Sequence, residues 1–232
     1  MKTLLTVSSL RYQYPDGHEA LKGVSFDINS GEKVALVGAN GSGKSTLLLL
    51  IAGAMDQTSG EILFNGSDDP ETRRRKTGLI FQDADDQILM PTVAEDVAFT
   101  PVAYGMDRRE AHALAMKILS SLGVEHLASR VPHKLSGGEK RMATFAGILA
   151  ASPEMLLLDE PTAALDPAAR RRVINFLRDT DMTLLLATHD LDIALEVCGS
   201  ALVMSHGTLS AAGKLPELFN DEKILLENNL KA

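Results

Sequence analysis

The sequence has no tryptophan, a single cysteine and few other aromatic residues, and these shortages exclude several kinds of site. Aromatic residues make up only 4% of the 232 residues. The lone Cys198 rules out an internal disulfide and a cysteine-rich zinc site. The six histidines are scattered, and no two stand at the i, i+4 spacing of a helical metal site. We therefore expect no protein-bound transition metal.

Long apolar runs are also missing. The longest, residues 47–55 and 145–151, are far shorter than the ~20 residues that cross a bilayer. The N-terminus lacks the apolar segment of a secretory signal peptide. We expect a cytoplasmic chain, so any membrane role must come through a partner. The formal net charge of −8 argues against binding to nucleic acid, which usually requires a basic face.

Short apolar runs alternate with helical patterns, which is typical of a parallel α/β fold. Strand-like runs cover residues 2–7, 20–28, 33–37, 61–64, 155–158 and 183–187. The turn residues Pro15-Asp16-Gly17 separate the first two runs. From about residue 83 to residue 151 the pattern is helical, and one helix over residues 108–122 should stop at Gly123. This stretch is predicted to be an inserted subdomain.

The segment from Gly38 to Ser45 (GANGSGKS) matches the P-loop pattern and lies between an apolar strand and a helix. Its glycines allow backbone N–H groups to face phosphate oxygens, and the helix N-terminus adds partial positive charge. Lys44 would supply a cation for the β- and γ-phosphates, and the Ser45 hydroxyl a ligand for Mg²⁺. Kinases, GTPases and transport ATPases share this loop, so it predicts ATP-type binding without naming the reaction.

Two adjacent acids, Asp159 and Glu160, end the apolar run 155–158. In open parallel sheets, ligands bind at the carboxyl ends of the strands. Asp159 is therefore expected to hold the hydration shell of Mg²⁺, and Glu160 to orient and deprotonate an attacking water. Neighbouring strand residues point to opposite faces, so the two acids should have different roles. The alternative is a polar strand end that faces water.

The signature segment, Leu135–Glu139, supports two readings that are compatible. Ser136 and Glu139 form a capping box that predicts a helix through Ala151. The glycine-rich helix start also presents N–H groups and the helix dipole to an anion. The P-loop already serves a phosphate of its own, so an anion bound here would come from elsewhere.

With this segment the sequence resembles the ATP-binding-cassette (ABC) ATPases, and the resemblance covers nearly the whole chain. It implies an α/β P-loop NTPase core with a mainly parallel sheet, an N-terminal antiparallel β subdomain and an inserted helical subdomain. One domain of residues 1–232 is expected, with the core and β subdomain in 1–82 and 152–232. The helical subdomain with the signature segment would cover 83–151.

The resemblance also implies roles for individual residues. Tyr14 would stack on adenine, Gln82 would sense Mg²⁺, residues 163–166 would cross a dimer interface, and His189 would act as a switch near the γ-phosphate. The signature segment would reach the γ-phosphate of the partner's ATP. The expected nucleotide-binding residues are Tyr14, Gly38, Asn40, Gly41, Ser42, Gly43, Lys44, Ser45, Thr46, Gln82, Ser136, Gly137, Gly138 and Asp166. The expected Mg²⁺ ligands are Ser45, Gln82 and Asp159, and the expected catalytic residues are Glu160, His189 and Lys44.

The sequence departs from the family at two positions. Lys140 stands where many members have Gln, and Ala163 where Ser is common. Neither change removes a catalytic group, so we expect an active ATPase. One chain carries both halves of a complete site, which predicts a homodimer or a dimer with a closely related ATPase.

Residues 81–88 and 91–99 resemble the energy-coupling-factor ATPases, which serve cobalt, nickel and vitamin uptake. This implies a peripheral position at the cytoplasmic face of the cell membrane, with a transmembrane coupling protein and a substrate-binding membrane subunit as partners. Cobalt or nickel is the preferred cargo, and biotin or another vitamin the alternative. A soluble ATPase acting on DNA or ribosomes and a regulatory nucleotide-binding module remain alternatives of other classes. Asp83, Asp85 and Asp86 either guide docking to an arginine-bearing partner or cap a helix.

Overall fold

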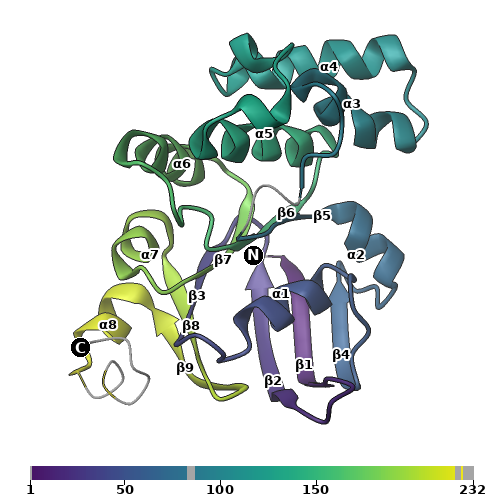
Figure 1. The fold of residues 1–232 in the computed structure, drawn as a ribbon. Helices are drawn as coiled ribbons and strands as arrows, with labels where there is room; N and C mark the ends of the chain where they lie inside the picture. The colour runs from purple at the N-terminus through teal and green to yellow at the C-terminus, as the bar shows by residue number, and fades with distance from the viewer. Residues whose placement is uncertain (1, 83–86, 223–225, 227–232) are drawn as a thin grey trace. The chain divides into compact units, whose positions relative to one another are not determined.

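The computed structural model describes residues 2–82, 87–222 and 226, and the chain divides into two compact units (Figure 1). The first unit comprises Met1–Leu79, Glu154–Glu160 and Leu177–Ala232. The second comprises Ile80–Pro153 and Pro161–Phe176. The second unit thus contains the stretch predicted to be helical, together with a segment that follows the acid pair.

An antiparallel sheet forms from the N-terminal part of the first unit. Its strands are β1 (Thr3–Gln13), β2 (Glu19–Asn29) and β4 (Ser59–Phe64), in the order β2-β1-β4. The predicted turn joins β1 to β2, where Gly17 has φ 90° and the Asp16 carboxylate accepts the His18 N–H at 2.9 Å. This sheet is the antiparallel β part that the family resemblance implied.

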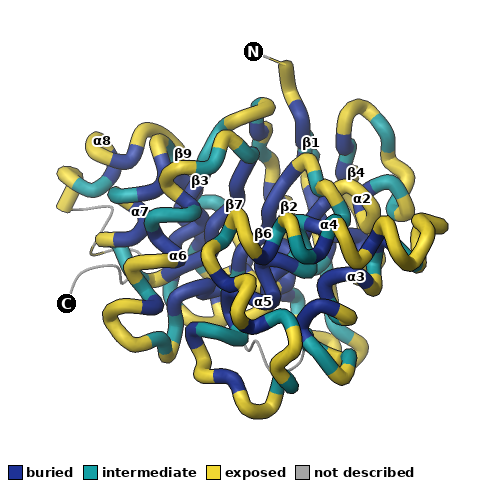
Figure 2. Tube along the Cα trace, turned by 90° about the horizontal axis from the view of Figure 1, so that it is seen from above, coloured by how far each residue is buried: buried dark blue, intermediate teal, exposed yellow. Residues whose placement is uncertain are grey.

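The second sheet of this unit has the order β5-β6-β7-β3-β8-β9 among the described residues. Its strands are β3 (Lys33–Val37), β5 (Thr77–Ile80), β6 (Met155–Asp159), β7 (Thr183–Thr188), β8 (Ser200–Ser205) and β9 (Thr208–Lys214). The pairs β6/β7, β3/β7 and β3/β8 are parallel, and β8/β9 is antiparallel. Strands β3, β6 and β7 each contain an unbroken apolar run, 34–37, 155–158 and 184–187, whose side chains are buried on both faces of the sheet (Figure 2). The predicted mainly parallel α/β fold is confirmed.

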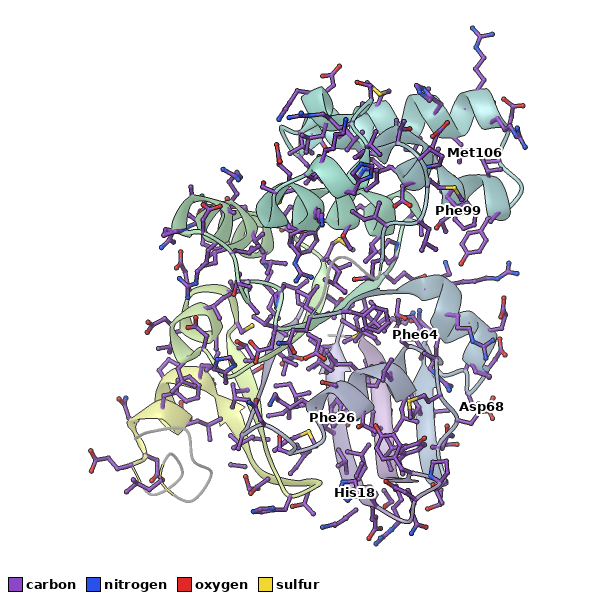
Figure 3. The ribbon with its side chains drawn as sticks, in the orientation of Figure 1. His18, Phe26, Phe64, Asp68, Phe99 and Met106 are labelled. Atoms are coloured by element: carbon purple, nitrogen blue, oxygen red, sulfur yellow. The ribbon has the colours of Figure 1, made fainter. Side chains whose placement is uncertain are left out.

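One buried cluster joins the two sheets of the first unit through helix α1 (Lys44–Ile51). Phe64 lies fully inside it, and Phe26 packs against its edge (Figure 3). The other helices of this unit are α2 (Pro70–Lys76), α7 (Leu191–Val197) and α8 (Leu215–Asn220). Helix α1 begins at Lys44, before the apolar run that predicted it, because the last residues of the P-loop form its first turn.

Helices build the second unit: α3 (Val93–Ala103), α4 (Arg108–Ser121), α5 (Gly137–Ala150) and most of α6 (Pro167–Asp179), with 3₁₀ turns at Glu125–Leu127 and Pro132–Lys134. Their apolar faces pack together, and Phe145 meets Phe176 edge-to-face at 5.1 Å. The predicted capping box of Ser136 and Glu139 is present and starts α5. The predicted acidic cluster of Asp83, Asp85 and Asp86 lies outside the described residues.

Candidate functional site

The predicted phosphate and catalytic residues of the first unit follow three adjacent strands. The P-loop follows β3, Asp159 ends β6, and His189 follows β7. These strands are neighbours in the order β6-β7-β3 and run parallel, so their carboxyl ends meet at one edge of the sheet. Ligands bind at this edge in open α/β sheets. The strand order therefore brings the predicted groups together.

The P-loop requires glycine for its close approach to the neighbouring chain. Gly43 has φ 104°, and a Cβ at this position would lie 2.8 Å from the carbonyl oxygen of Ala20. Ser42 lies in the same loop, and its Oγ is buried without a hydrogen-bond partner among the described residues. Buried hydroxyls are normally bonded, so this atom fits a site that receives phosphate oxygens.

Lys44 is buried, and its ammonium donates hydrogen bonds to the carbonyl oxygens of Gly38 (2.7 Å) and Ala39 (3.1 Å). Burial lowers the pKa of Lys44, while the carboxylates of Glu160 and Asp159 act in the opposite direction. The cation is therefore held at the mouth of the loop by neutral acceptors. A phosphate is a stronger, charged acceptor for the same ammonium.

Asp159 accepts a hydrogen bond from the side chain of Ser45. Burial raises the pKa of the Asp159 carboxyl, whereas the bond to Ser45 and the charge of Lys44 lower it. A hydroxyl and a carboxylate in contact are hard oxygen donors of the kind that Mg²⁺ takes alongside phosphates and water. The donor set of Ser45 and Asp159 therefore fits Mg²⁺. Within the described ranges no cluster of three His, Cys, Asp or Glu side chains could hold a metal by itself.

Glu160 leaves the strand in the left-handed region, with φ 45°, and its N–H donates to the carbonyl oxygen of Ala187 at 2.9 Å. A left-handed conformation is uncommon for a residue with a side chain and costs on the order of 1 kcal/mol. The turn sends the Glu160 carboxylate toward the end of β7, while Asp159 faces Ser45. The two acids have different partners because of this turn, rather than because of strand alternation alone.

Three hydrogen bonds hold the Glu160 carboxylate. The Thr188 hydroxyl donates to Oε2 at 3.0 Å, the His189 N–H donates to Oε1 at 2.9 Å, and the His189 Nδ1 lies 2.6 Å from Oε1. A carboxylate only accepts, so the imidazole donates through Nδ1 and its Nε2 is left to face outward. The His189 side chain is 67% exposed, whereas that of Glu160 is 10% exposed. The Glu160 carboxylate is thus enclosed, and the histidine remains accessible.

Tyr14 lies in the hairpin turn between β1 and β2. Its hydroxyl is 2.9 Å from the Thr46 hydroxyl, so the ring is tied to the helix that leaves the P-loop. Tyr12 packs edge-on against it at 4.9 Å, and the His18 ring is nearly parallel to it at 6.3 Å. Tyr14 is therefore an aromatic platform linked by a hydrogen bond to Thr46, both of which were predicted to bind nucleotide.

The remaining predicted residues belong to the second unit. Ser136 and Gly137 are exposed at the start of α5, while Gly138 is buried, and a Cβ there would overlap the Ala169 side chain. Asp166 caps α6, where its carboxylate accepts the N–H groups of Ala168 and Ala169. These backbone hydrogen bonds lower the pKa of Asp166. Because Ala169 in the first turn of α6 lies so close to position 138, only glycine fits at that position of the signature segment.

Several predicted residues have few contacts that define a role. Asn40 and Gly41 are exposed at the tip of the P-loop. Gln82 follows β5, and its carbonyl oxygen accepts a bond from Arg141. The sequence-based reasoning missed Thr188 and Arg141. Thr188 closes the apolar run 184–187, and this contrast was a signal for it, whereas Arg141 follows two other charged residues and stands out in no such way.

No helix within the described residues is long and apolar enough to span a bilayer.

Comparison with known proteins identifies the family. The ABC transporter family model matches residues 21–163. The energy-coupling factor transporter ATP-binding protein EcfA of Methanosphaera stadtmanae is 38% identical, over 100% of this chain and 86% of that protein. The structure of cbiO1 from Clostridium perfringens, part of the ABC transporter complex cbiONQ, is 35% identical with a TM-score of 0.85, over 100% of this chain and 96% of that one. A nucleotide-free ATP-binding cassette from an ABC transporter is 26% identical with a TM-score of 0.84, over 96% of this chain and 97% of that one. The chain belongs to the ABC transporter family and is an ATP-binding subunit that hydrolyses ATP.

Proposed function

We propose that this chain is the ATPase of an energy-coupling-factor importer, working as a dimer on the cytoplasmic face of the membrane. The relative named as an energy-coupling factor ATP-binding protein and the cbiO1 structure support this proposal, because both match the chain over its full length. The observation that carries the catalytic part is the Glu160 carboxylate, which is held by Thr188 and His189 at the carboxyl edge of the sheet.

Each catalytic site is proposed to combine two copies. The P-loop of one copy and Tyr14 bind ATP, while Ser136, Gly137 and Gly138 of the other copy bind its γ-phosphate. The exposed start of α5 supports this role, since free N–H groups and the helix dipole attract an anion. Asp166 begins the helix that packs against Gly138 and is proposed to lie at the dimer interface.

Within the site, Lys44 exchanges its carbonyl acceptors for phosphate oxygens and stabilises the charge that develops on them. Glu160 accepts a proton from the attacking water, and the imidazole of His189 leaves Glu160 and donates its hydrogen bond to the γ-phosphate. Mg²⁺ bound through Ser45, Asp159 and Gln82 would neutralise negative charge on the phosphates. Loss of the γ-phosphate removes the group that joins the two copies, so the dimer opens.

The variant Glu160→Gln tests the catalytic proposal. The amide keeps the shape and an acceptor for the His189 N–H, but it cannot take a proton. We expect ATP binding to persist, turnover to fall by about 10²- to 10⁴-fold, and a dimer to accumulate with ATP. Glu154→Gln is the matched control, because Glu154 pairs with Lys76 and Asn65 instead. Turnover near that of the unmodified protein in Glu160→Gln would overturn the assignment of the base.

Affinity purification from detergent-solubilised native membranes tests the transport proposal. We expect a transmembrane coupling protein and a substrate-binding membrane subunit to be recovered with the chain. Recovery of the chain alone, or with ribosomes or DNA, would leave the ATPase chemistry intact and refute the importer.

The proposed cargo is cobalt or nickel. The purified complex, placed in liposomes with ATP on the side of the ATPase, should accumulate Co²⁺ or Ni²⁺, and the Glu160→Gln complex should not. Uptake of biotin or another vitamin in place of the metals would assign the importer to the vitamin class.

A further inference from the structure

A buried arginine in the second unit binds the backbone of the loop that contains Gln82. Arg141, on α5, is 2% exposed. One guanidinium nitrogen donates to the carbonyl oxygen of Phe81 at 2.6 Å, and another donates to that of Gln82 at 2.5 Å. These residues lie about 60 positions away in the sequence. The contact is therefore a long-range tie between a helix and a loop.

Burying a guanidinium is costly unless its N–H groups are paired, and the bonds to Phe81 and Gln82 pair two of its nitrogens, while the buried Nε makes no hydrogen bond among the described residues. The planar group presents several donors in a fixed fork, which matches two successive carbonyl oxygens. A lysine ammonium carries its donors on one nitrogen at the end of a flexible stem and would hold the two carbonyls less rigidly. Arg141 thus fixes both the position and the orientation of the Phe81–Gln82 backbone.

The same loop is held at other points by the helical unit. The Phe81 N–H donates to Oε1 of Gln87 at 2.9 Å. Farther along, the Asp96 carboxylate accepts the N–H groups of Leu89 (2.8 Å) and Met90 (3.1 Å). Residues 81–82 are therefore tied to α5, and residues 89–90 are tied to α3.

Arg141 also lies close to the signature segment. It stands one helical turn after Gly137, the first residue of α5, and a turn advances the helix by only about 5.4 Å. A shift of the Gln82 backbone would therefore be transmitted to the first turn of α5 through a rigid side chain.

We propose that Arg141 is a positioning residue that couples Gln82 to the signature segment. The proposal rests on the proposed function, in which Gln82 serves the nucleotide of its own chain and Ser136–Gly138 serve the nucleotide of the partner. Arg141 then links the two nucleotide sites of the dimer. It acts through the backbone of Gln82 and touches neither nucleotide.

Steady-state ATPase measurements on Arg141→Met and Arg141→Lys test this role. Met fills a similar volume without donors, whereas Lys keeps one charged donor. We expect Arg141→Met to lower kcat by about 10- to 100-fold and to raise the Mg²⁺ concentration for half-maximal activity, with KM for ATP changed by less than about threefold. Arg141→Lys should recover part of kcat. Lys117→Met, which removes an exposed cation from the same unit, is the control and should behave like the unmodified protein.

A double-mutant cycle with Gln82→Ala separates positioning from general stability. If Arg141 acts through Gln82, adding Arg141→Met to Gln82→Ala should lower kcat by less than about twofold more. Multiplicative losses, or a folded Arg141→Met protein with unchanged kcat and Mg²⁺ dependence, would overturn the proposal. If Arg141→Met does not fold, the same cycle is run with Arg141→Lys.

Glu160→Gln distinguishes the failure of this inference from the failure of the proposed function. An inactive Glu160→Gln protein together with an unaffected Arg141→Met protein refutes only the coupling role. An active Glu160→Gln protein refutes the proposed mechanism itself. Amide hydrogen exchange supplies a readout without turnover: residues 87–90 and the first turn of α5 should both exchange faster in Arg141→Met, and unchanged protection in either segment would contradict the tie.

Discussion

Replacing Thr188 by Val should damage both the stability of the first unit and its catalysis. Thr188 is fully buried at the end of β7. Its hydroxyl donates to Oε2 of Glu160 at 3.0 Å and accepts the N–H of Asp190 at 3.0 Å. The accepted bond leaves the single hydroxyl proton for the carboxylate, so the direction of each bond is determined. Valine has nearly the same shape and removes both bonds without opening a cavity.

The expected loss follows from these two bonds. A hydrogen bond to a charged group contributes about 1.5–3 kcal/mol, and a second bond to a backbone amide adds about 1 kcal/mol. Some of this is recovered by local rearrangement, so we expect the free energy of unfolding to fall by about 2–3 kcal/mol. In a protein of this size, each kcal/mol lowers Tm by about 2–4 °C, which gives a decrease of about 4–12 °C.

Calorimetry and ATPase assays on Thr188→Val and Thr188→Ser measure the two effects. Serine keeps the hydroxyl and loses one methyl group, so it should cost about 1 kcal/mol of stability and retain most of kcat. Valine should lower kcat at least tenfold at saturating ATP, because Glu160 loses one of the groups that orient it. A valine variant with the Tm and kcat of the unmodified protein would refute the claim that Thr188 positions the Glu160 carboxylate.

Two further predictions concern the second unit. Gly138→Ala should lower Tm and abolish most ATP hydrolysis, because the added Cβ overlaps the Ala169 side chain at a cost of about 1–3 kcal/mol of stability. Gly137→Ala is the control in the same thermal scan. Its Cβ would lie 4.0 Å from Leu165, so Tm should stay nearly unchanged. Burial raises the pKa of Asp96 above 3.8 in the folded state. Between about 3.8 and the raised pKa, the folded state therefore binds more protons than the unfolded chain. The free energy of unfolding falls as the pH rises through this range. Asp96→Asn keeps an acceptor for Leu89 and Met90 without the charge and should raise Tm at pH 7 but not at pH 3, whereas a lower Tm at pH 7 would contradict this account.

Much of the fold and of the first-unit site could be predicted because the signals are local. Continuous apolar runs at residues 33–37, 155–158 and 183–187 indicated strands buried on both faces, and the structure has β3, β6 and β7 there. The polar residues that follow such strands fall at one edge only if the strands are parallel neighbours. That last condition is the order β6-β7-β3, which depends on packing across the chain and has no local pattern.

The contacts of Thr188 and Arg141 could not be predicted for the same physical reason. Thr188 bonds a residue 28 positions away, and Arg141 bonds one 60 positions away. The partner of Thr188 is the carboxylate of Glu160, whose direction depends on a left-handed backbone conformation, and the partners of Arg141 are two backbone carbonyls. Neither kind of partner produces a periodic pattern in the sequence. Glu160 illustrates the limit: strand alternation correctly suggested that the two acids differ, but the φ of 45° that separates them was visible only in the structure.

The ionised groups of the first-unit site are all bonded to protein atoms, and this determines how a nucleotide can bind. Lys44 bonds two neutral carbonyls, so a charged phosphate offers it a stronger acceptor and should displace them readily. The bond between His189 and Glu160 already involves a carboxylate, so only a strong acceptor can draw the imidazole away. In the proposed mechanism that acceptor is the γ-phosphate, which ADP lacks. In this proposed mechanism, the partner already bound to each side chain should make Lys44 responsive to any nucleotide phosphate and His189 selective for a triphosphate.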